Sequence, residues 1–352
     1  MMKFRFMNKK AVVFGLVVML SMGTLTGCKS DTKIVFTTGL SGNQLFKIGS
    51  TTCTMPEAMV YLTTFYNQYA DIYGPEMWNY DFGGVSLEEH VKEVVLSKLA
   101  QIKIMNLMAE ERDIKLSDEE EKKVKTAAES YYSKLDEAFI DAEEVTQSIV
   151  ETVYREYAIA NKVYATITEA ADMEISDDEA RAVTVQAIYF PNWKLKNNEK
   201  VSLSENETLN VLKKAKEALQ KINADEDFET VAMQYSEDKQ IVKSYARGFV
   251  ETHFEELLFS MDEGDISDII ETKDGYYIVK CIRTIDYEAT QQNKLVLAEK
   301  RKKEAFLKAY TEVAESTHSQ FKDKHWKLVT LKEEIHSTDA NFFNIYDEFV
   351  KQ

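Results

Sequence analysis

The chain has 352 residues, of which 44% are hydrophobic and 11% aromatic, and its formal net charge is −17. This length favours two domains over one, and the 3 Pro and 12 Gly are too few for a low-complexity linker. The negative charge argues against a nucleic-acid partner, because an acidic surface repels phosphate groups.

The first 27 residues are typical of a signal peptide for export. Four basic residues precede an apolar run at 11–20, which is too short to span a membrane comfortably. The run leads to "LTGC", residues 25–28, which resembles the bacterial lipobox and its lipidated cysteine. We therefore expect a lipoprotein anchored through Cys28 at the outer face of a bacterial cytoplasmic membrane. A buried helix followed by an incidental cysteine is the alternative.

The other two cysteines, Cys53 and Cys281, lie far apart in the sequence. A disulfide framework would need more cysteines at closer spacing, so we expect both to be free and buried, although the sequence does not decide whether they pair. The five histidines show no metal-ligand spacing such as HExxH. We therefore predict no metal and no cofactor.

Residues 28–174 are predicted to be mainly helical, after two short strands at 34–39 and 45–50. A first helix begins at Thr54, because Pro56 is tolerated in a first turn. Aromatic residues then recur at helical steps; they are Tyr61, Phe65, Tyr66, Tyr69 and Tyr73. This face either packs in the core or offers unfolded chains an exposed surface.

Capping signals and apolar periodicity predict the next helices. One helix runs from about Ser86 to Arg112, and another starts at Ser117, where Glu120 completes a capping box. The same signature recurs at Ser176 and precedes a change of pattern from helical to mixed.

Residues 175–286 read as an αβ module. A strand at 182–190, closed by a proline, leads into a charged loop at 194–207. Three helices and a two-stranded hairpin follow, at 207–222, 227–238, 251–265, 268–273 and 276–284. The hairpin turn is placed at Asp274-Gly275.

Residues 287–352 return to helix, at 289–321, followed by a predicted strand at 325–331 and an acidic, aromatic tail. We expect this last helix and tail to pack on the N-terminal region. The predicted fold is therefore α+β: a mostly helical domain from both ends of the chain, with an inserted small antiparallel sheet flanked by helices.

Three stretches carry a family resemblance: "DFETVAMQYSED" at 227–238, "RGFVETHFEELLFSMDEGDISDII" at 247–270 and "DGYYIVK" at 274–280. With the lipobox and the flanking helices, they resemble the PrsA/SurA group of exported foldases. Residues 175–286 are similar to a parvulin-type peptidyl-prolyl isomerase (rotamase) domain. The resemblance implies a chaperone region that holds unfolded or partly folded exported polypeptides.

The resemblance also implies site residues. The barrier to rotation about a prolyl peptide bond is about 18–20 kcal/mol. An apolar slot for the proline ring, the exclusion of water and polar groups beside the twisted amide lower this barrier. The family's slot aligns with Tyr245, Val250 and Phe254, which could equally be core residues. The polar group that faces the twisting amide aligns with Asp238, whose alternative is an exposed helix end.

Two departures from the family pattern concern its facing histidines. Ala187 and Tyr277 occupy their positions, and of these only Tyr277 keeps a hydrogen-bonding group, as a catalytic candidate. The family strand before the slot is also shortened, with only "KSY" at 243–245 remaining. These losses should weaken catalysis more than abolish it.

Two functions follow. The first is an extracytoplasmic, membrane-anchored foldase that assists the folding of exported proteins and retains a weakened isomerase activity. The second is a non-catalytic holdase chaperone whose parvulin-like domain only binds extended client segments. A solute-binding lipoprotein ranks third, because the chain lacks alternating βα units. The clients are not named by the sequence, and a homodimer stays open.

Overall fold

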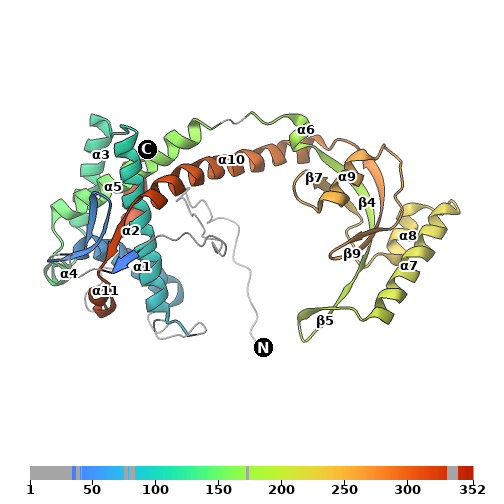
Figure 1. The fold of residues 1–352 in the computed structure, drawn as a ribbon, viewed down its shortest axis with the longest axis horizontal. Helices are drawn as coiled ribbons and strands as arrows, with labels where there is room; N and C mark the ends of the chain where they lie inside the picture. The colour runs from blue at the N-terminus through green and yellow to red at the C-terminus, as the bar shows by residue number, and fades with distance from the viewer. Residues whose placement is uncertain are drawn as a thin grey trace. The chain divides into compact units, whose positions relative to one another are not determined.

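The computed structural model describes residues 34–36, 40, 42–74, 78, 84–171, 174–330 and 340–351. The chain divides into two compact units, one of Met1–Ala170 with Ala305–Gln352 and one of Ala171–Glu304 (Figure 1). The predicted signal peptide and Cys28 lie outside the described residues. Within those residues, no helix combines the length and the apolar character needed to cross a membrane.

The unit boundaries differ from the predicted ones at 174/175 and 286/287. The long helix α10 (Tyr287–Ser316) is continuous, and its first turns belong to the second unit. The reason lies in two buried side chains: Thr290 Oγ1 accepts from Ala182 N, and Asn293 Nδ2 donates to Ala180 O, both at 3.0 Å. These contacts fix the start of α10 to the sheet of the second unit.

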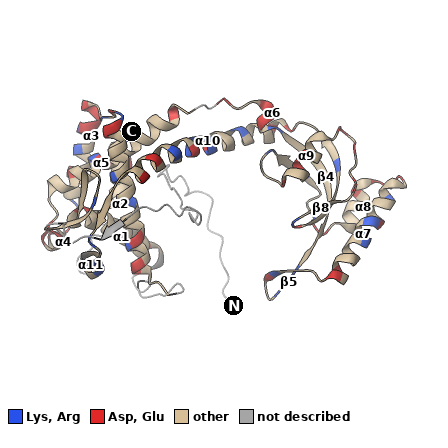
Figure 2. Ribbon diagram, in the orientation of Figure 1, with Lys and Arg blue, Asp and Glu red and all other residues tan. Residues whose placement is uncertain are grey.

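The first unit is a helical bundle that includes the last turns of α10, from Ala305. Its other helices are α1 (Met55–Tyr73), α2 (Leu87–Glu111), α3 (Asp118–Tyr132), α4 (Glu137–Glu143), α5 (Gln147–Glu169), α11 (Asp323–Leu328) and α12 (Phe342–Phe349). Capping boxes at Ser86 and Ser117 start α2 and α3 as predicted. Four acidic residues open α3, where the helix dipole favours negative charge (Figure 2).

A four-stranded sheet completes this unit. Its strands, in spatial order, are β1 (Ile34–Phe36), β10 (Ser319–Phe321), β2 (Gln44–Ile48) and β3 (Thr51–Thr54). The predicted helix to residue 321 ends at Ser316 instead, because β10 pairs with β1 and β2. The predicted strand at 325–331 is wrong: α11 forms there and buries Trp326. A short apolar run does not by itself distinguish strand from helix.

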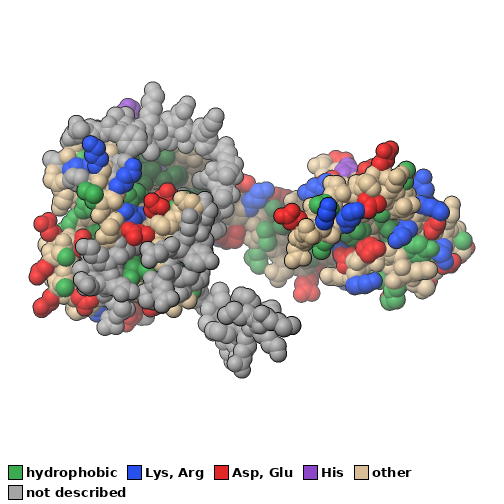
Figure 3. Space-filling model, turned by 90° about the horizontal axis from the view of Figure 1, so that it is seen from below, with side chains coloured by type: hydrophobic (Ala, Val, Ile, Leu, Met, Phe, Trp, Pro, Cys, Tyr) green, Lys and Arg blue, Asp and Glu red, His purple; other side chains and the backbone are tan. Residues whose placement is uncertain are grey.

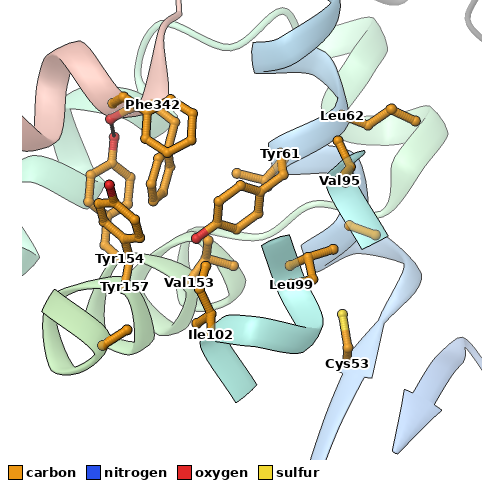
Figure 4. Packing of buried hydrophobic residues seen from close by; sticks show 14 of the residues in the cluster. Cys53, Tyr61, Leu62, Val95, Leu99, Ile102, Val153, Tyr154, Tyr157 and Phe342 are labelled. Atoms are coloured by element: carbon orange, nitrogen blue, oxygen red, sulfur yellow. Dashed lines mark hydrogen bonds between the residues drawn. The ribbon is translucent and has the colours of Figure 1, made fainter. Parts of the chain in front are cut away.

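Aromatic rings fill the core of the first unit (Figure 4). Phe342 of the C-terminal tail lies 4.2 Å from the Tyr154 ring and 4.9 Å from the Tyr61 ring, between centroids. Tyr61 and Tyr66 are buried, so the aromatic face of α1 packs in the core at these positions and does not form an exposed client surface. The tail is thus a structural part of this unit.

One ionised group is buried in the same core. Lys103, 1% exposed, lies 3.1 Å from a Glu57 oxygen and 2.6 Å from a Glu156 oxygen. Burial opposes the charge, but the two carboxylates outweigh it and hold the pKa of Lys103 above its usual value. This triad joins α1, α2 and α5.

The sheet of the first unit is mixed, because β1 and β10 pair in parallel, whereas the second unit contains an antiparallel sheet. Its strands, in order, are β7 (Val242–Ala246), β4 (Ala182–Pro191), β9 (Gly275–Arg283) and β8 (Ile270–Thr272). The helices of this unit before α10 are α6 (Asp177–Ala180), α7 (Glu205–Asn223), α8 (Phe228–Tyr235) and α9 (Thr252–Ser260). The predicted α+β class, a mostly helical domain with an inserted unit of antiparallel sheet and flanking helices, is confirmed.

A hairpin replaces the predicted charged loop. Strands β5 (Trp193–Lys196) and β6 (Glu199–Ser202) pair across Asn197 and Asn198, whose φ values are 53° and 65°. Two successive positive φ angles are those of a type I′ turn, which asparagine tolerates.

Each face of the four-stranded sheet in the second unit packs on different helices. Helices α7 and α8 cover one face, over Ile188, Phe190, Tyr276 and Ile278. Helix α9 covers the other, over residues that alternate with these: Val183, Val185, Ala187 and Val279. Cys281 belongs to this second face and Cys53 to the core of the first unit; both are buried and free, as expected.

Candidate functional site

Four aromatic rings lie in a row on the face of the sheet that α9 covers. The centroid of Phe254 lies 5.6 Å from that of Tyr245 and 5.0 Å from that of Tyr277. Tyr189 continues the row, 4.8 Å from Tyr277. These spacings are typical of favourable aromatic pairs. We call these four residues, with Val250, the aromatic cluster.

Strand register explains why the rings meet. Tyr189 of β4 and Tyr277 of β9 are direct partners, and Ala187 pairs with Val279. Ala187 and Tyr277 therefore lie on one face, diagonal to each other. On α9, Phe254 and Leu258 are one turn apart and point to the same apolar layer.

Phe254 is the deep member of the cluster. It is 3% exposed, whereas Tyr245, Val250 and Tyr277 are half-buried and pack against the same layer. The structure thus brings together all three residues aligned with the slot and adds Tyr277 beside them. Phe254 is therefore both a core residue and a member of the aromatic cluster.

Asp238 lies in the connection between α8 and β7. Its carboxylate accepts from the Lys243 ammonium and, at 2.9 Å, from Gln240 N; these bonds hold the pKa of Asp238 below its usual value. Burial raises the pKa of Tyr245 to about 12, and the Asp238 charge adds to this shift. Asp238 also contributes, after burial, to the raised pKa of Tyr277 and of Tyr189. The carboxylate therefore acts electrostatically on the cluster.

The tyrosine hydroxyls of the cluster differ in their partners. Tyr189 Oη donates to Asp274 O at 2.7 Å and accepts from Trp193 Nε1 at 3.1 Å. In the described part of the chain, no hydrogen bond involves the hydroxyl of Tyr245 or Tyr277. Two phenol groups beside an apolar surface are thus available to a ligand, each as donor and acceptor.

Tyr189 was missed from the sequence. It stands two residues after Ala187 in the same strand, so strand alternation already placed both on one face. The alternation of side chains along the strand would therefore have placed Tyr189 beside Ala187, the position aligned with the family histidine.

Comparison with known proteins adds to this geometry. A family model described as Rotamase, the PPIC-type PPIase domain, matches residues 195–283. The foldase protein PrsA of Caldanaerobacter subterraneus is 24% identical over 217 residues, 60% of this chain and 63% of the relative. Foldase protein PrsA 3 of Bacillus cereus is 30% identical over 177 residues, 47% of this chain and 54% of the relative.

The chain is therefore similar to PrsA foldases, and its residues 195–283 match the parvulin-type rotamase domain. It spans less than two thirds of the length of these two PrsA relatives. Residues 195–283 include β8, β9 and α9, so the aromatic cluster belongs to the rotamase domain except for Tyr189 of β4.

Two solved structures are also similar. The Bacillus cereus PrsA peptidylprolyl isomerase structure has 18% identity and a TM-score of 0.37, covering 73% of this chain and 94% of that one. A SurA-like chaperone structure from Campylobacter jejuni has 12% identity and a TM-score of 0.27, covering 80% of this chain and 99% of that one.

Proposed function

We propose that this chain is a lipid-anchored, extracytoplasmic foldase that binds exported polypeptides, and that its rotamase domain isomerises prolyl peptides weakly at the aromatic cluster. One observation carries the proposal: two phenol hydroxyls without a hydrogen bond in the described chain lie beside an apolar, half-buried surface, and the Asp238 carboxylate adds to the raised pKa of both. That combination suits a proline ring next to its polar amide.

The chemistry requires no bond to break. Planar amide resonance places negative charge on oxygen, so an apolar surface disfavours the planar form relative to the twisted one. The ionised carboxylate of Asp238 disfavours the same charge separation when it faces the carbonyl oxygen. The Tyr277 hydroxyl can donate to the twisted amide, whose nitrogen has regained its lone pair.

Two features weaken such catalysis. Ala187, 2% exposed, offers no side-chain hydrogen bond at the position where the family resemblance leads one to expect a histidine. The Asp238 carboxylate is already engaged by Lys243, so a substrate has to compete with that ion pair. One hydrogen bond contributes about 1 kcal/mol, and its loss costs roughly fivefold in rate.

These same features favour a second candidate function, a holdase. In that case the cluster grips apolar segments, with or without proline, and releases them unchanged. The Asp238–Lys243 pair is the specific observation in its favour, because it leaves the site without a free charged group.

Two assays on the chain from residue 29 separate the candidates: proline-limited refolding of a model protein, and suppression of aggregation. The foldase account predicts a refolding rate above the uncatalysed one, reduced by Asp238→Asn and by Phe254→Leu, and unchanged by Tyr276→Phe on the opposite face. An uncatalysed rate combined with full suppression of aggregation would leave only the holdase.

The lipid anchor has its own test in a bacterial host. The chain with Cys28 should fractionate with membranes and carry an acyl modification by mass spectrometry, whereas Cys28→Ser should be released into the soluble exported fraction. Cys53→Ser is the matched control and should stay with the membrane, because Cys53 is buried in the core of the first unit. Equal fractionation of all three chains would exclude the anchor.

A further inference from the structure

Strand β7 forms one edge of the sheet in the second unit. Arg247 N donates to Arg181 O at 3.0 Å, just beyond one end of its pairing with β4. Ala187 N donates to Ile241 O at 2.8 Å, just beyond the other end. Because bonded and non-bonded pairs alternate in an antiparallel ladder, every second residue of β7 points its N–H and C=O away from β4. These residues are Val242, Ser244 and Ala246.

A groove of about 650 Å³ lies beside this edge. Ser244, Tyr245 and Ala246 line one side, and the first turns of α10 line the other. Two apolar lining residues are well exposed: Phe249 at 61% and Val296 at 49%. An edge strand next to exposed apolar side chains is a surface on which another strand can pair.

The groove is acidic. Its lining contains Asp286 and Glu288 and neither lysine nor arginine. The Asp286 carboxylate accepts from Ser244 Oγ at 2.6 Å and from Thr184 Oγ1 at 2.9 Å. Charges of both signs are intermixed over the face of the second unit that Figure 3 displays, so a lining of one sign is a local feature. It complements a basic partner.

We propose that β7 and this groove bind an extended polypeptide segment, with apolar and basic residues in alternation, as an added fifth strand. The unpaired N–H and C=O groups select an extended backbone, Phe249 and Val296 take the apolar side chains, and Asp286 and Glu288 take the basic ones. The inference rests on the proposed function, which supplies unfolded chains as partners.

The groove adjoins the aromatic cluster. Tyr245 and Val250 belong to both, since each lines the groove and packs against the layer under α9. A segment paired on β7 is therefore held next to the surface proposed for proline. This arrangement lets the edge strand hold a client by its backbone while the aromatic cluster contacts the neighbouring residues.

The probe is a proline-free decapeptide of alternating valine and lysine, with a valine–glutamate decapeptide as its charge control. Amide hydrogen exchange is measured by NMR on the chain from residue 29, with and without peptide. Binding should slow exchange at Val242, Ser244 and Ala246 at least tenfold. The glutamate peptide should bind at least tenfold more weakly.

Two substitutions at one position isolate the backbone contribution. Ser244→Pro removes the outward N–H, and proline is tolerated on an edge strand; Ser244→Ala removes only the hydroxyl. The proline variant should lose at least tenfold in affinity, and the alanine variant less than threefold. If Ser244→Pro fails to fold, Glu288→Gln serves instead and should weaken the lysine peptide three- to tenfold.

Three results would overturn the inference: exchange slowed only around Tyr277 and Phe254, no binding at millimolar peptide, or slowed exchange at Ser244 without peptide in a dimeric chain. The last would assign the edge to a second copy. Because the probe lacks proline, each of these results leaves the refolding and aggregation assays to decide the proposed function separately.

Discussion

The ring of Tyr277 lies in the row of the aromatic cluster, between the rings of Phe254 and Tyr189, and carries a phenol hydroxyl. Burial raises its pKa, and the neighbouring tyrosines and Asp238 add to the shift, so the group stays protonated at neutral pH. The Tyr277 hydroxyl can therefore donate a hydrogen bond at neutral pH. An imidazole at this position would instead titrate near neutrality.

Tyr277→Phe should lower the catalysed part of the isomerisation rate about three- to tenfold, because it removes one hydrogen bond and no apolar surface. The affinity for a prolyl peptide should change less than twofold. Tyr276→Phe is the matched control: its ring lies on the opposite face, in the layer under α7 and α8. Equal rates for the two variants would remove Tyr277 from the mechanism.

Much of the cluster could be predicted from the sequence, because its members follow recognisable motifs. Tyr245, Val250, Phe254 and Tyr277 meet as the aligned stretches imply. The ion pair between Asp238 and Lys243 could not be predicted, since it depends on the path of the shortened connection into β7. Side-chain partners across a loop are not encoded in periodicity.

The hairpin of β8 and β9 depends on one glycine. Thr272 pairs with Gly275, so Lys273 and Asp274 form the turn and Gly275 opens β9, one residue earlier than the sequence suggested. Gly275 has φ 149°, and a Cβ there would lie 2.2 Å from Phe190 O. Only glycine permits this approach of β9 to β4.

Gly275→Ala should therefore destabilise the chain by at least about 2 kcal/mol in urea unfolding, because the backbone of β4 has to move. Gly264→Ala is the control. Gly264 also has a positive φ, 94°, but a Cβ there meets nothing within 4 Å, so only the backbone strain of about 1 kcal/mol remains. Equal losses for both would show that the contact with Phe190 is relieved without cost.

Helix α12 anchors the C-terminal tail in the first unit. Phe342 is fully buried, and its carbonyl accepts from Tyr154 Oη at 2.9 Å. The amino-acid composition indicated only that this tail is acidic and aromatic. Its aromatic residues complete a core built from α1, α3 and α5, which no local pattern in the tail reveals.

Phe342→Ala should cost about 3–5 kcal/mol of unfolding free energy, because it leaves a cavity among five aromatic rings. Phe249→Ala, at a phenylalanine that is 61% exposed, should change the unfolding free energy by less than about 0.5 kcal/mol. Both follow from urea titrations. A small loss at Phe342 would mean that the tail is not integral to the core.

The hairpin of β5 and β6 and the strand β10 were not predicted from the sequence, for two different reasons. Two asparagines stand between Trp193–Lys196 and Glu199–Ser202, a sequence that favours a type I′ turn, but the high charge of the segment led to a loop assignment. Strand β10 is different, because its partners lie almost 300 residues away in the chain. Pairing at such distance has no local signal.

At the scale of the whole molecule, the buried tyrosines make the free energy of unfolding depend on pH in the alkaline range. Burial raises the pKa of Tyr131, Tyr154 and Tyr157 in the first unit. The folded chain keeps these protons where unfolded tyrosines lose theirs, near pH 10. The stabilisation is therefore complete below about pH 10 and is lost as the pH rises beyond it.

The tyrosine contribution to the unfolding free energy should be constant from pH 8 to 9.5 and fall above pH 10, by about 1.4 kcal/mol per pH unit for each tyrosine that stays protonated only when folded. Urea unfolding followed by circular dichroism at pH 8, 9.5 and 11 measures this. Tyr131→Phe should reduce the slope. A flat profile to pH 11 would contradict the assignment of these hydroxyls as buried and protonated.

The central claim is that the aromatic cluster is a binding site for prolyl segments, which the foldase requires and which the holdase binds among other apolar segments. Titrating the ¹⁵N-labelled chain from residue 29 with a short proline-containing peptide tests it by amide chemical shifts. The account predicts the largest shifts at Tyr245, Val250 and Tyr277, and their loss in Phe254→Leu. Shifts confined to the first unit, or none at millimolar peptide, would contradict it.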